Sequence, residues 1–334
     1  MAEPRVEIVL PSRPSPQASP GRAAWAGRLT LWSVTSMLAF FGLAAATSTL
    51  WLLTPLARAP WFDALHRVAL AGVLATGTVA TLLLFLVHRM LVPPRQSMYE
   101  SLAGARVHVG LTAWNDEEAI GPAVRDFKAC PEVHKVVVVD NNSRDGTARV
   151  AREAGADAVV IETRPGYGSC CMRALAEAAE GADVVILCEG DMTFAAADVK
   201  KLIAYLENCD LALGTRATQE LREVDSQMDW LLNPGNQVVA KLVQTRFWGT
   251  RLTDMGCTYR AMRVGAYRRL AGRLRVRGNH FSPHMFIEAL KLGMRVIEIP
   301  IYFRARVGES KGVGSNKVKA ARVAIKMIGL IYKA

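Results

Sequence analysis

Two long stretches without a charged side chain limit what the first hundred residues can fold into. Residues 29–57 and 68–88 contain no Asp, Glu, Lys or Arg. A helix needs about 20 apolar residues to cross a bilayer, and both stretches reach that length. The alternatives are a buried helical hairpin or a cleaved signal peptide, although the first stretch starts late for a signal peptide and a second follows at once. We therefore predict two transmembrane helices within residues 29–91.

The residues around these stretches predict how the chain is oriented. Residues 1–28 are rich in Pro, Ser, Ala and Arg and lack apolar periodicity, which is typical of a disordered tail. Basic residues flank both outer ends of the pair, and two more lie in the short joint between them. This distribution favours both ends in the cytosol. We expect a multi-pass protein of the inner (cytoplasmic) membrane, with its tail and its main domain in the cytosol.

From residue 105 onward, short apolar runs alternate with helix-like stretches. The runs lie at 107–111, 136–139, 158–161 and 184–187. Buried β-branched runs separated by helices are typical of a parallel sheet that is covered on both faces. In such sheets ligands bind beyond the carboxyl ends of the strands. The sequence thus predicts an α/β domain over residues 105–312, with a site at that edge.

The C-terminal part of the chain is strongly basic. The whole chain has a net charge of +11, yet residues 246–334 alone hold 19 Lys and Arg against four Asp and Glu. Such a region suggests nucleic acid, anionic lipid or a phosphorylated substrate as partner. We expect no nucleic-acid partner, because zinc-finger spacing and aromatic RNA-binding signatures are missing. Residues 313–334 predict a basic amphipathic helix, which either lies at the lipid interface or packs on the domain.

Four polar motifs follow the predicted strands at the edge where a ligand would bind. They are TAWNDEE at 112–118, DNNSRDGT at 140–147, RPGYG at 164–168 and EGD at 189–191. Their order and spacing resemble those of the family 2 glycosyltransferases, which implies the GT-A fold, a Rossmann-like and mostly parallel sheet with flanking helices. The branch they resemble most contains dolichyl-phosphate mannose synthase and the polyprenyl-phosphate glycosyltransferases. The resemblance covers residues 105–312.

The first three motifs suggest how a nucleotide-sugar donor would bind. A carboxylate at the end of a buried strand can accept hydrogen bonds from a nucleobase. Asp140 fits that role, and the resemblance implies it for Asp140 and Glu117, with Ala113 contributing its backbone. Gly166 permits close approach of the chain to a nucleotide, and Arg164 beside it adds a phosphate or ribose contact. The structural alternative for these residues is a plain turn or loop.

The acidic pair Glu189 and Asp191 lies where the family carries its Asp-x-Asp motif. Two carboxylates one residue apart after a strand can hold Mg²⁺ or Mn²⁺, because both ions prefer oxygen ligands. The ion would bridge the donor diphosphate and act as a Lewis acid on the leaving group. Asp191 is the stronger candidate as metal ligand and catalytic residue. Glu189 departs from the family pattern, and it is a candidate for the metal or for the ribose.

Downstream residues predict the acceptor side of the site. The segment LTDMGCTYR at 252–260 resembles the acceptor segment of the family, which makes Asp254 a candidate general base for a hydroxyl acceptor. A lipid phosphate is already anionic and needs no strong base, and in that case Arg216 and Arg260 would hold it. A structural ion pair is the alternative for Arg260. His280 is a further candidate for acceptor binding.

The segment RARVGESK at 304–311 resembles a family loop that carries Arg, Ser and Lys. Such a loop suits closure over phosphates, so we assign Arg306, Ser310 and Lys311 to a donor or acceptor phosphate. The resemblance implies an inverting, metal-dependent transferase that moves a sugar from UDP or GDP to a polyprenyl phosphate. The alternatives are transfer to a hydroxyl of a neutral lipid or glycan, and a membrane scaffold with a decayed nucleotide-sugar site.

Overall fold

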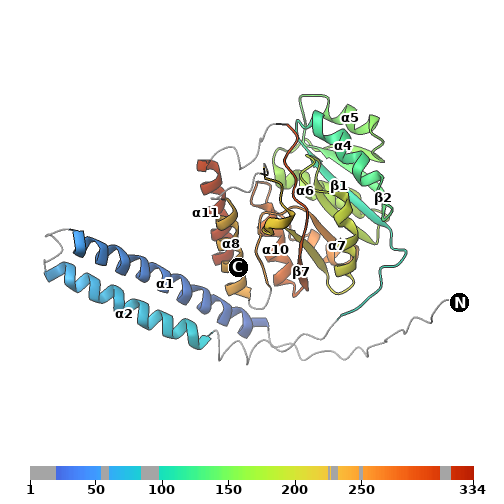
Figure 1. The fold of residues 1–334 in the computed structure, drawn as a ribbon. Helices are drawn as coiled ribbons and strands as arrows, with labels where there is room; N and C mark the ends of the chain where they lie inside the picture. Colours follow the sequence, from blue (N-terminus) through green and yellow to red (C-terminus); the bar gives the residue numbers. More distant parts are fainter. Residues whose placement is uncertain are drawn as a thin grey trace. The chain divides into compact units, whose positions relative to one another are not determined.

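The chain divides into two compact units, residues 1–97 and residues 98–334. The computed structural model describes residues 20–53, 60–83, 98–224, 226, 232–247, 251–308 and 317–334. Figure 1 shows the first unit as a pair of long helices and the second as a sheet with helices around it. Of the ranges in the sequence predictions, residues 1–19, 54–57, 84–97 and 309–316 therefore lie outside the described residues.

The N-terminal unit consists of helices α1 (Pro20–Leu53) and α2 (Pro60–Leu82). Both contain a segment long and apolar enough to cross a membrane. Each helix starts before its uncharged stretch, because Pro suits the first helical turn and the following residues, charged ones included, continue the helix. Residues 20–28 are therefore helical. The composition predicts a disordered tail there, and for these residues that prediction is wrong. Asp63 and Arg67, expected in the joint, form an i,i+4 ion pair on α2.

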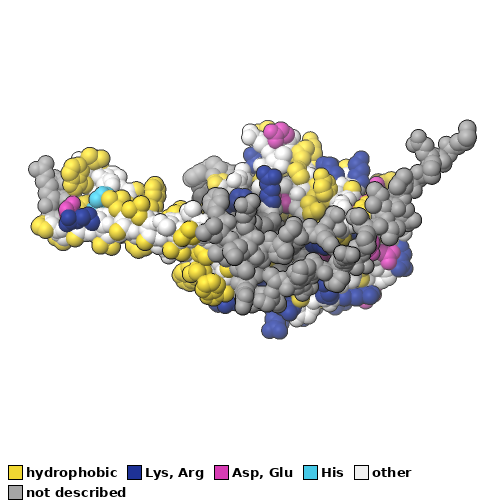
Figure 2. All heavy atoms as spheres, turned by 90° about the horizontal axis from the view of Figure 1, so that it is seen from below, with side chains coloured by type: hydrophobic (Ala, Val, Ile, Leu, Met, Phe, Trp, Pro, Cys, Tyr) yellow, Lys and Arg dark blue, Asp and Glu magenta, His cyan; other side chains and the backbone are white. Residues whose placement is uncertain are grey.

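The two helices pack against each other as an antiparallel hairpin. Gly72 of α2 lies so close to the ring of Phe40 in α1 that a Cβ atom would stand 2.5 Å from it. Thr47 of α1 forms a 2.8 Å hydrogen bond with His66 of α2. In the most apolar 18-residue stretch of each helix, only 22% of the residues are buried in α1 and 11% in α2. The core helix of a soluble protein is mostly buried. On the face that Figure 2 shows, hydrophobic side chains are exposed along the hairpin.

Seven strands of the described chain form one mixed sheet, in the order β3-β2-β1-β4-β6-β5-β7. They are β1 (Val107–Ala113), β2 (Val133–Asp140), β3 (Ala158–Ile161), β4 (Val184–Glu189), β5 (Leu211–Thr215), β6 (Arg260–Arg263) and β7 (Val296–Pro300). The prediction of a mostly parallel sheet is confirmed. Only β6, of these seven, runs antiparallel to its neighbours β4 and β5. It does so because the chain enters it from the carboxyl edge of β4.

The strand register brings the polar motifs to one edge of this sheet. Ala113 at the end of β1 lies beside Asp140 of β2, and Thr112 lies beside Glu189 of β4. The backbone ladder continues one residue past the strands, since the amides of Asn141 and Gly190 donate to β1 carbonyls at 2.9 Å. Motifs that are 28 and 77 residues apart in sequence therefore begin at the same level of the sheet.

Helices cover both faces of the sheet. On one face α6 (Tyr167–Ala179) packs against β1, β2 and β4. On the other face lie α4 (Glu117–Lys128) and α7 (Val199–Leu206), whose apolar sides complete the main core. The other helices of this unit are α5 (Thr147–Glu153), α8 (Leu232–Phe247), α9 (Val264–Ala271), α10 (Phe281–Lys291), α11 (Lys317–Lys333) and the short 3-10 turns η3 (Ala196–Asp198) and η4 (Gln219–Leu221).

The C-terminal helix α11 packs on this unit beside α8 and α10 (Figure 1). Its Met327 and Ile331 are buried, whereas Ile325 is 69% exposed. Arg246 of α8 donates to the carbonyl of Ala334 at 2.7 Å and ties the chain end down. The predicted amphipathic helix is therefore present, and part of its apolar stripe is used within the unit.

Candidate active site

A pocket of about 730 Å³ opens at the carboxyl edge of the sheet. This volume lies within the usual range for small-molecule sites. The ends of β1, β2 and β4 and the start of α6 form one side, and residues of α8, α10 and α11 form the other. The charged and amide side chains in its wall are Asn115, Asp116, Asn141, Asn142, Arg144, Glu189, Asp191, Arg216, Asn236, Asn279 and Arg306.

Asp191 is one of two buried carboxylates in the wall of this pocket, and Asp116 is the other. Its Oδ1 accepts hydrogen bonds from the amide of Thr193 at 3.1 Å and from the Thr193 hydroxyl at 2.5 Å. Its Oδ2 lies 3.2 Å from Nη1 of Arg306. Burial, and then repulsion by Glu189, raise the pKa of Asp191 to about 7 against the opposing charge of Arg306. An additional cation in the pocket would stabilise the charged form of this carboxylate.

Glu189 is held by two hydroxyl groups behind it. The Tyr167 hydroxyl donates to Glu189 Oε1 at 2.8 Å, and the Thr258 hydroxyl donates to the same oxygen at 2.7 Å. Tyr167 and Thr258 also contact each other closely. Burial raises the pKa of Tyr167 well above its usual value, so the phenol stays protonated and remains a donor. These contacts orient a Glu at the position where the family pattern has Asp.

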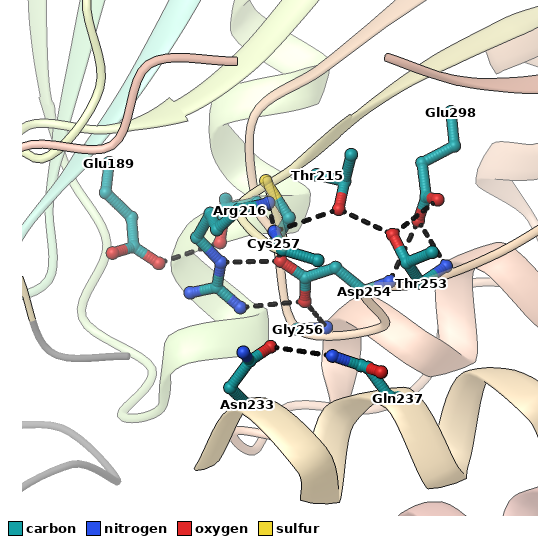
Figure 3. Close-up of polar contacts among 12 residues, drawn as sticks. Glu189, Thr215, Arg216, Asn233, Gln237, Thr253, Asp254, Gly256, Cys257 and Glu298 are labelled. Carbon is teal, nitrogen blue, oxygen red and sulfur yellow. Dashed lines mark hydrogen bonds and ion pairs between the residues drawn. The ribbon is translucent and has the colours of Figure 1, made fainter. Parts of the chain in front are cut away.

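Arg216 and Asp254 form a two-pronged ion pair (Figure 3). The Arg216 Nε and Nη2 atoms donate to the two carboxylate oxygens at 2.7 and 2.9 Å. The Arg216 and Gly256 amides add two further bonds to Asp254. Burial alone would raise the pKa of Asp254, but the Arg216 charge and these bonds outweigh it and hold the pKa below its usual value. The Asp254 side chain is fully buried, and Arg216 is the partner that reaches the pocket.

A second carboxylate, that of Glu298, supports the loop that carries Asp254. Glu298 of β7 accepts hydrogen bonds from the amides of Thr253 and Asp254, both at 2.9 Å, and from the Thr253 hydroxyl at 2.8 Å (Figure 3). Thr253 in turn bonds the hydroxyl of Thr215 at the end of β5. Glu298 thus fixes the loop that carries Asp254, and Asp254 orients the guanidinium of Arg216.

The structure places the two predicted base contacts outside the pocket wall. Asp140 is buried, and its Oδ1 accepts hydrogen bonds from the amide and the hydroxyl of Ser143. Glu117 bonds the amide of Gly146 at 2.9 Å and pairs with Arg149, which links α4 to the start of α5. The backbone contribution of Ala113 has a better basis, since Ala113 itself lines the pocket.

The RPGYG motif also divides between the pocket and the surface. Arg164 is 61% exposed and pairs with the buried Glu162 at 3.1 Å, and it is not among the residues that line the pocket. Gly166 does line it, with a φ of 118° that favours glycine. Gly168 lies against the backbone of Arg277, whose carbonyl accepts from the Gly168 amide at 2.7 Å. One glycine therefore shapes the pocket and the other permits a close packing contact.

The remaining predicted acceptor residues lie beside the pocket. Arg260 is buried and donates to the backbone carbonyls of Cys257 and Ser282, and these bonds replace the ion pair that was its structural alternative. His280 is half-buried just before α10, and it is not among the lining residues, although Asn279 is. Burial lowers the pKa of His280 below its usual value. Ser310 and Lys311 lie outside the described residues.

Several residues of the pocket were not among the sequence candidates. Asp116 of the first motif forms a 2.8 Å ion pair with Arg306, and its position after a strand was the available signal. Asn236 of α8 and the apolar Val323 and Met327 of α11 also line the pocket. No local pattern marks these three, because only the packing of α8 and α11 brings them to the sheet edge.

The pocket offers a divalent cation only some of the ligands that it needs. Among the described residues no group of three or more His, Cys, Asp or Glu side chains is close enough to form a complete protein cage. Asp116 and Asp191 nevertheless converge on one positive group, the guanidinium of Arg306. Mg²⁺ is commonly bound by one or two carboxylates with substrate phosphates and water as its other ligands. The residues present fit a cation that arrives with a diphosphate.

This chain resembles proteins of one known family. Residues 109–271 match the glycosyl transferase family 2 domain. An uncharacterized glycosyltransferase of Mycobacterium tuberculosis is 34% identical over 227 residues, which cover 67% of this chain and 96% of that protein. The undecaprenyl-phosphate mannosyltransferase of Micrococcus luteus is 25% identical over 222 residues, which cover 63% of this chain and 88% of that protein.

Solved structures agree on the fold. The glucosyl-3-phosphoglycerate synthase of Mycobacterium tuberculosis, in complex with Mn²⁺, UDP and glucosyl-3-phosphoglycerate, aligns with a TM-score of 0.52 and 17% identity. The alignment covers 70% of this chain and 80% of that one. Three observations point to the same family. They are the sequence similarity over nearly the whole length of a relative, the matching domain and the ordered strand-end motifs. The chain belongs to the family 2 glycosyltransferases, and the protein is a glycosyltransferase.

Proposed function

We propose that this glycosyltransferase moves a sugar from a UDP- or GDP-sugar to a polyprenyl phosphate at the inner membrane, with inversion and with Mg²⁺ or Mn²⁺. One observation carries the proposal: a single pocket has paired carboxylates, Asp116 and Asp191, in its wall together with a positioned arginine, Arg216. The two carboxylates suit a divalent cation that is bound together with a diphosphate. Arginine held in a fixed orientation suits a second phosphate group.

The state of Asp254 favours a phosphate acceptor over a hydroxyl. A general base needs a free oxygen and a pKa near the working pH. Asp254 has both oxygens bonded to Arg216 or to backbone amides, and its pKa is held below the usual value. In this proposal Asp254 positions Arg216, and the acceptor phosphate supplies its own negative charge as nucleophile.

The helices support a membrane acceptor. Two apolar helices of spanning length precede the catalytic unit. Val323 and Met327 of α11 give the pocket an apolar side, which suits the start of a prenyl chain. Arg322 and Lys326, on the same helix, are exposed and suit anionic headgroups. We place the tail and the catalytic unit in the cytosol, where nucleotide sugars are available.

The proposal is tested with the full chain, purified in detergent. It is incubated with radiolabelled UDP- and GDP-sugars, Mg²⁺ or Mn²⁺, and either polyprenyl phosphate or the matching polyprenol. We expect label in the lipid phase with one nucleotide, with polyprenyl phosphate only, and with loss of the signal in EDTA. Label that appears with polyprenol but not with polyprenyl phosphate would overturn the acceptor, and label that persists in EDTA would overturn the metal.

The raised pKa of Asp191 predicts a pH dependence of cation use. Because burial and Glu189 raise this pKa to about 7, protons compete with the cation for the carboxylate below that pH. We expect the Mn²⁺ concentration for half-maximal transfer to be constant above pH 7.5 and to rise up to about tenfold per unit below pH 7. A sugar-linked diphosphate does not titrate in this range. A half-maximal concentration that stays constant down to pH 5.5 would contradict this assignment.

A further inference from the structure

Arg306 lies between two carboxylates in the wall of the pocket. The segment that carries it runs along the loop after β4, where Arg304 N donates to Thr193 O at 2.9 Å. Its guanidinium reaches back to both carboxylates: Nη2 lies 2.8 Å from Asp116 and Nη1 lies 3.2 Å from Asp191. The side chain is 14% exposed, and its Nε atom is buried without a hydrogen-bond partner among the described residues.

This arrangement places one positive group between two carboxylates from different strand ends. Asp116 follows β1 and Asp191 follows β4, and both side chains are nearly buried. Two buried carboxylates in one wall repel each other unless a cation lies with them. The guanidinium meets this need in the free protein. A divalent ion on the same oxygens would meet it too, so the ion and the guanidinium compete for one place.

The guanidinium is not bound there as firmly as it could be. It uses one oxygen of each carboxylate and leaves Nε unsatisfied, whereas the best arginine partners accept two parallel bonds from it. A diphosphate offers such paired oxygens. Its arrival provides Arg306 with a better partner and releases the carboxylates at the same time.

We propose that Arg306 makes cation binding conditional on the nucleotide. Without nucleotide the guanidinium holds Asp116 and Asp191 and excludes the ion. When a nucleoside diphosphate enters, Arg306 transfers to its phosphates and the two carboxylates become ligands for the ion. Asp116 is then a second carboxylate of the cation site, beside Asp191. This inference rests on the proposed use of a nucleotide donor, but its central element, competition between Arg306 and the ion, concerns the free protein.

The test measures Mn²⁺ binding directly, by the electron paramagnetic resonance signal of free Mn²⁺, with the full EDTA-treated chain in detergent. Arg306→Gln is compared with wild type and with Arg304→Gln. Arg304 lies two residues away on the same segment and pairs with Asp126 at 3.4 Å, outside the pocket wall, so it is a matched control for the loss of a positive charge. Each protein is titrated alone and with UDP or GDP.

Without nucleotide we expect Arg306→Gln to bind Mn²⁺ on the order of tenfold more tightly than wild type, because an ionic competitor is gone. Arg304→Gln should match wild type. The enhancement of Mn²⁺ affinity by nucleotide should be clear in wild type and smaller in Arg306→Gln. Equal or weaker Mn²⁺ binding by Arg306→Gln in the absence of nucleotide would overturn the inference, as would an equal gain in Arg304→Gln.

One further variant covers the case in which Arg306→Gln is unstable. If Arg306→Gln does not fold, Arg306→Lys replaces it: a single ammonium bridges two carboxylates less well than a fork, so its Mn²⁺ affinity should lie above that of wild type, and an affinity no higher than wild type overturns the inference. Failure of the proposed function is distinguishable. In that case neither UDP nor GDP changes Mn²⁺ affinity in any of the proteins, while the difference between Arg306→Gln and wild type without nucleotide persists.

Discussion

Replacing Asp191 with Asn is expected to reduce sugar transfer by about 10³-fold, since it removes the ligand whose cation offsets the charge of the leaving group. Asn keeps the shape of the side chain and can still accept a hydrogen bond from Thr193, so the pocket should persist. The loss should therefore appear mainly in kcat. It is measured in the lipid-phase transfer assay at saturating donor, acceptor and Mn²⁺.

A control variant separates this effect from a general loss of charge. Asp183→Asn removes a carboxylate that pairs with Arg106 on the surface, with about half of its side chain exposed. Exposed pairs contribute little to stability, so this variant should transfer sugar at nearly the wild-type rate. Transfer by Asp191→Asn within tenfold of wild type, with the thermal unfolding midpoint unchanged, would show that this carboxylate does not hold the catalytic cation.

Replacing Asp254 with Asn is expected to cause the largest loss of stability. The change leaves Arg216 charged, 16% exposed and without its anionic partner. Removing one member of a buried ion pair costs about 3–5 kcal/mol of unfolding free energy. For a unit of this size that corresponds to a fall in Tm on the order of 10 °C. Thermal unfolding of the full chain in detergent measures it, and Asp183→Asn is again the control with little expected change.

The same variant separates the two possible roles of Asp254. At a temperature where the protein is folded, a residue that positions Arg216 should raise the KM for polyprenyl phosphate far more than the KM for the nucleotide sugar. A general base would leave both KM values near wild type and reduce kcat. If Asp254→Asn shows the second pattern and loses little stability, the assignment of Asp254 as a positioning residue is wrong.

Much of the fold could be predicted from the chain alone. The apolar runs at 107–111, 136–139, 158–161 and 184–187 lie within β1, β2, β3 and β4. They were recognisable because a strand buried on both faces needs a continuous apolar run. The antiparallel strand β6 was not, because its four residues, RAMR, carry two arginines. Its place depends on pairing with β4 and β5, which are distant in sequence.

The candidate site was predicted less evenly. Glu189 and Asp191 lie in the pocket, as do Ala113, Gly166, Arg216 and Arg306. Asp140, Glu117 and Arg164 follow the same strands, but their side chains bond to neighbouring loops or to Glu162. A motif specifies which residues stand at a strand end. It does not specify which way each side chain turns, because that depends on partners from other segments.

By itself, the sequence determined the two long apolar helices, the first four strands and the family, because each follows from local apolar patterning or from the spacing of short motifs. Only the tertiary structure decided how the charges are paired. Arg216 meets Asp254 from 38 residues away, and Arg306 meets Asp116 from 190 residues away. In a buried site a charge takes the partner that the packed elements bring to it, and that choice is made in space rather than along the chain.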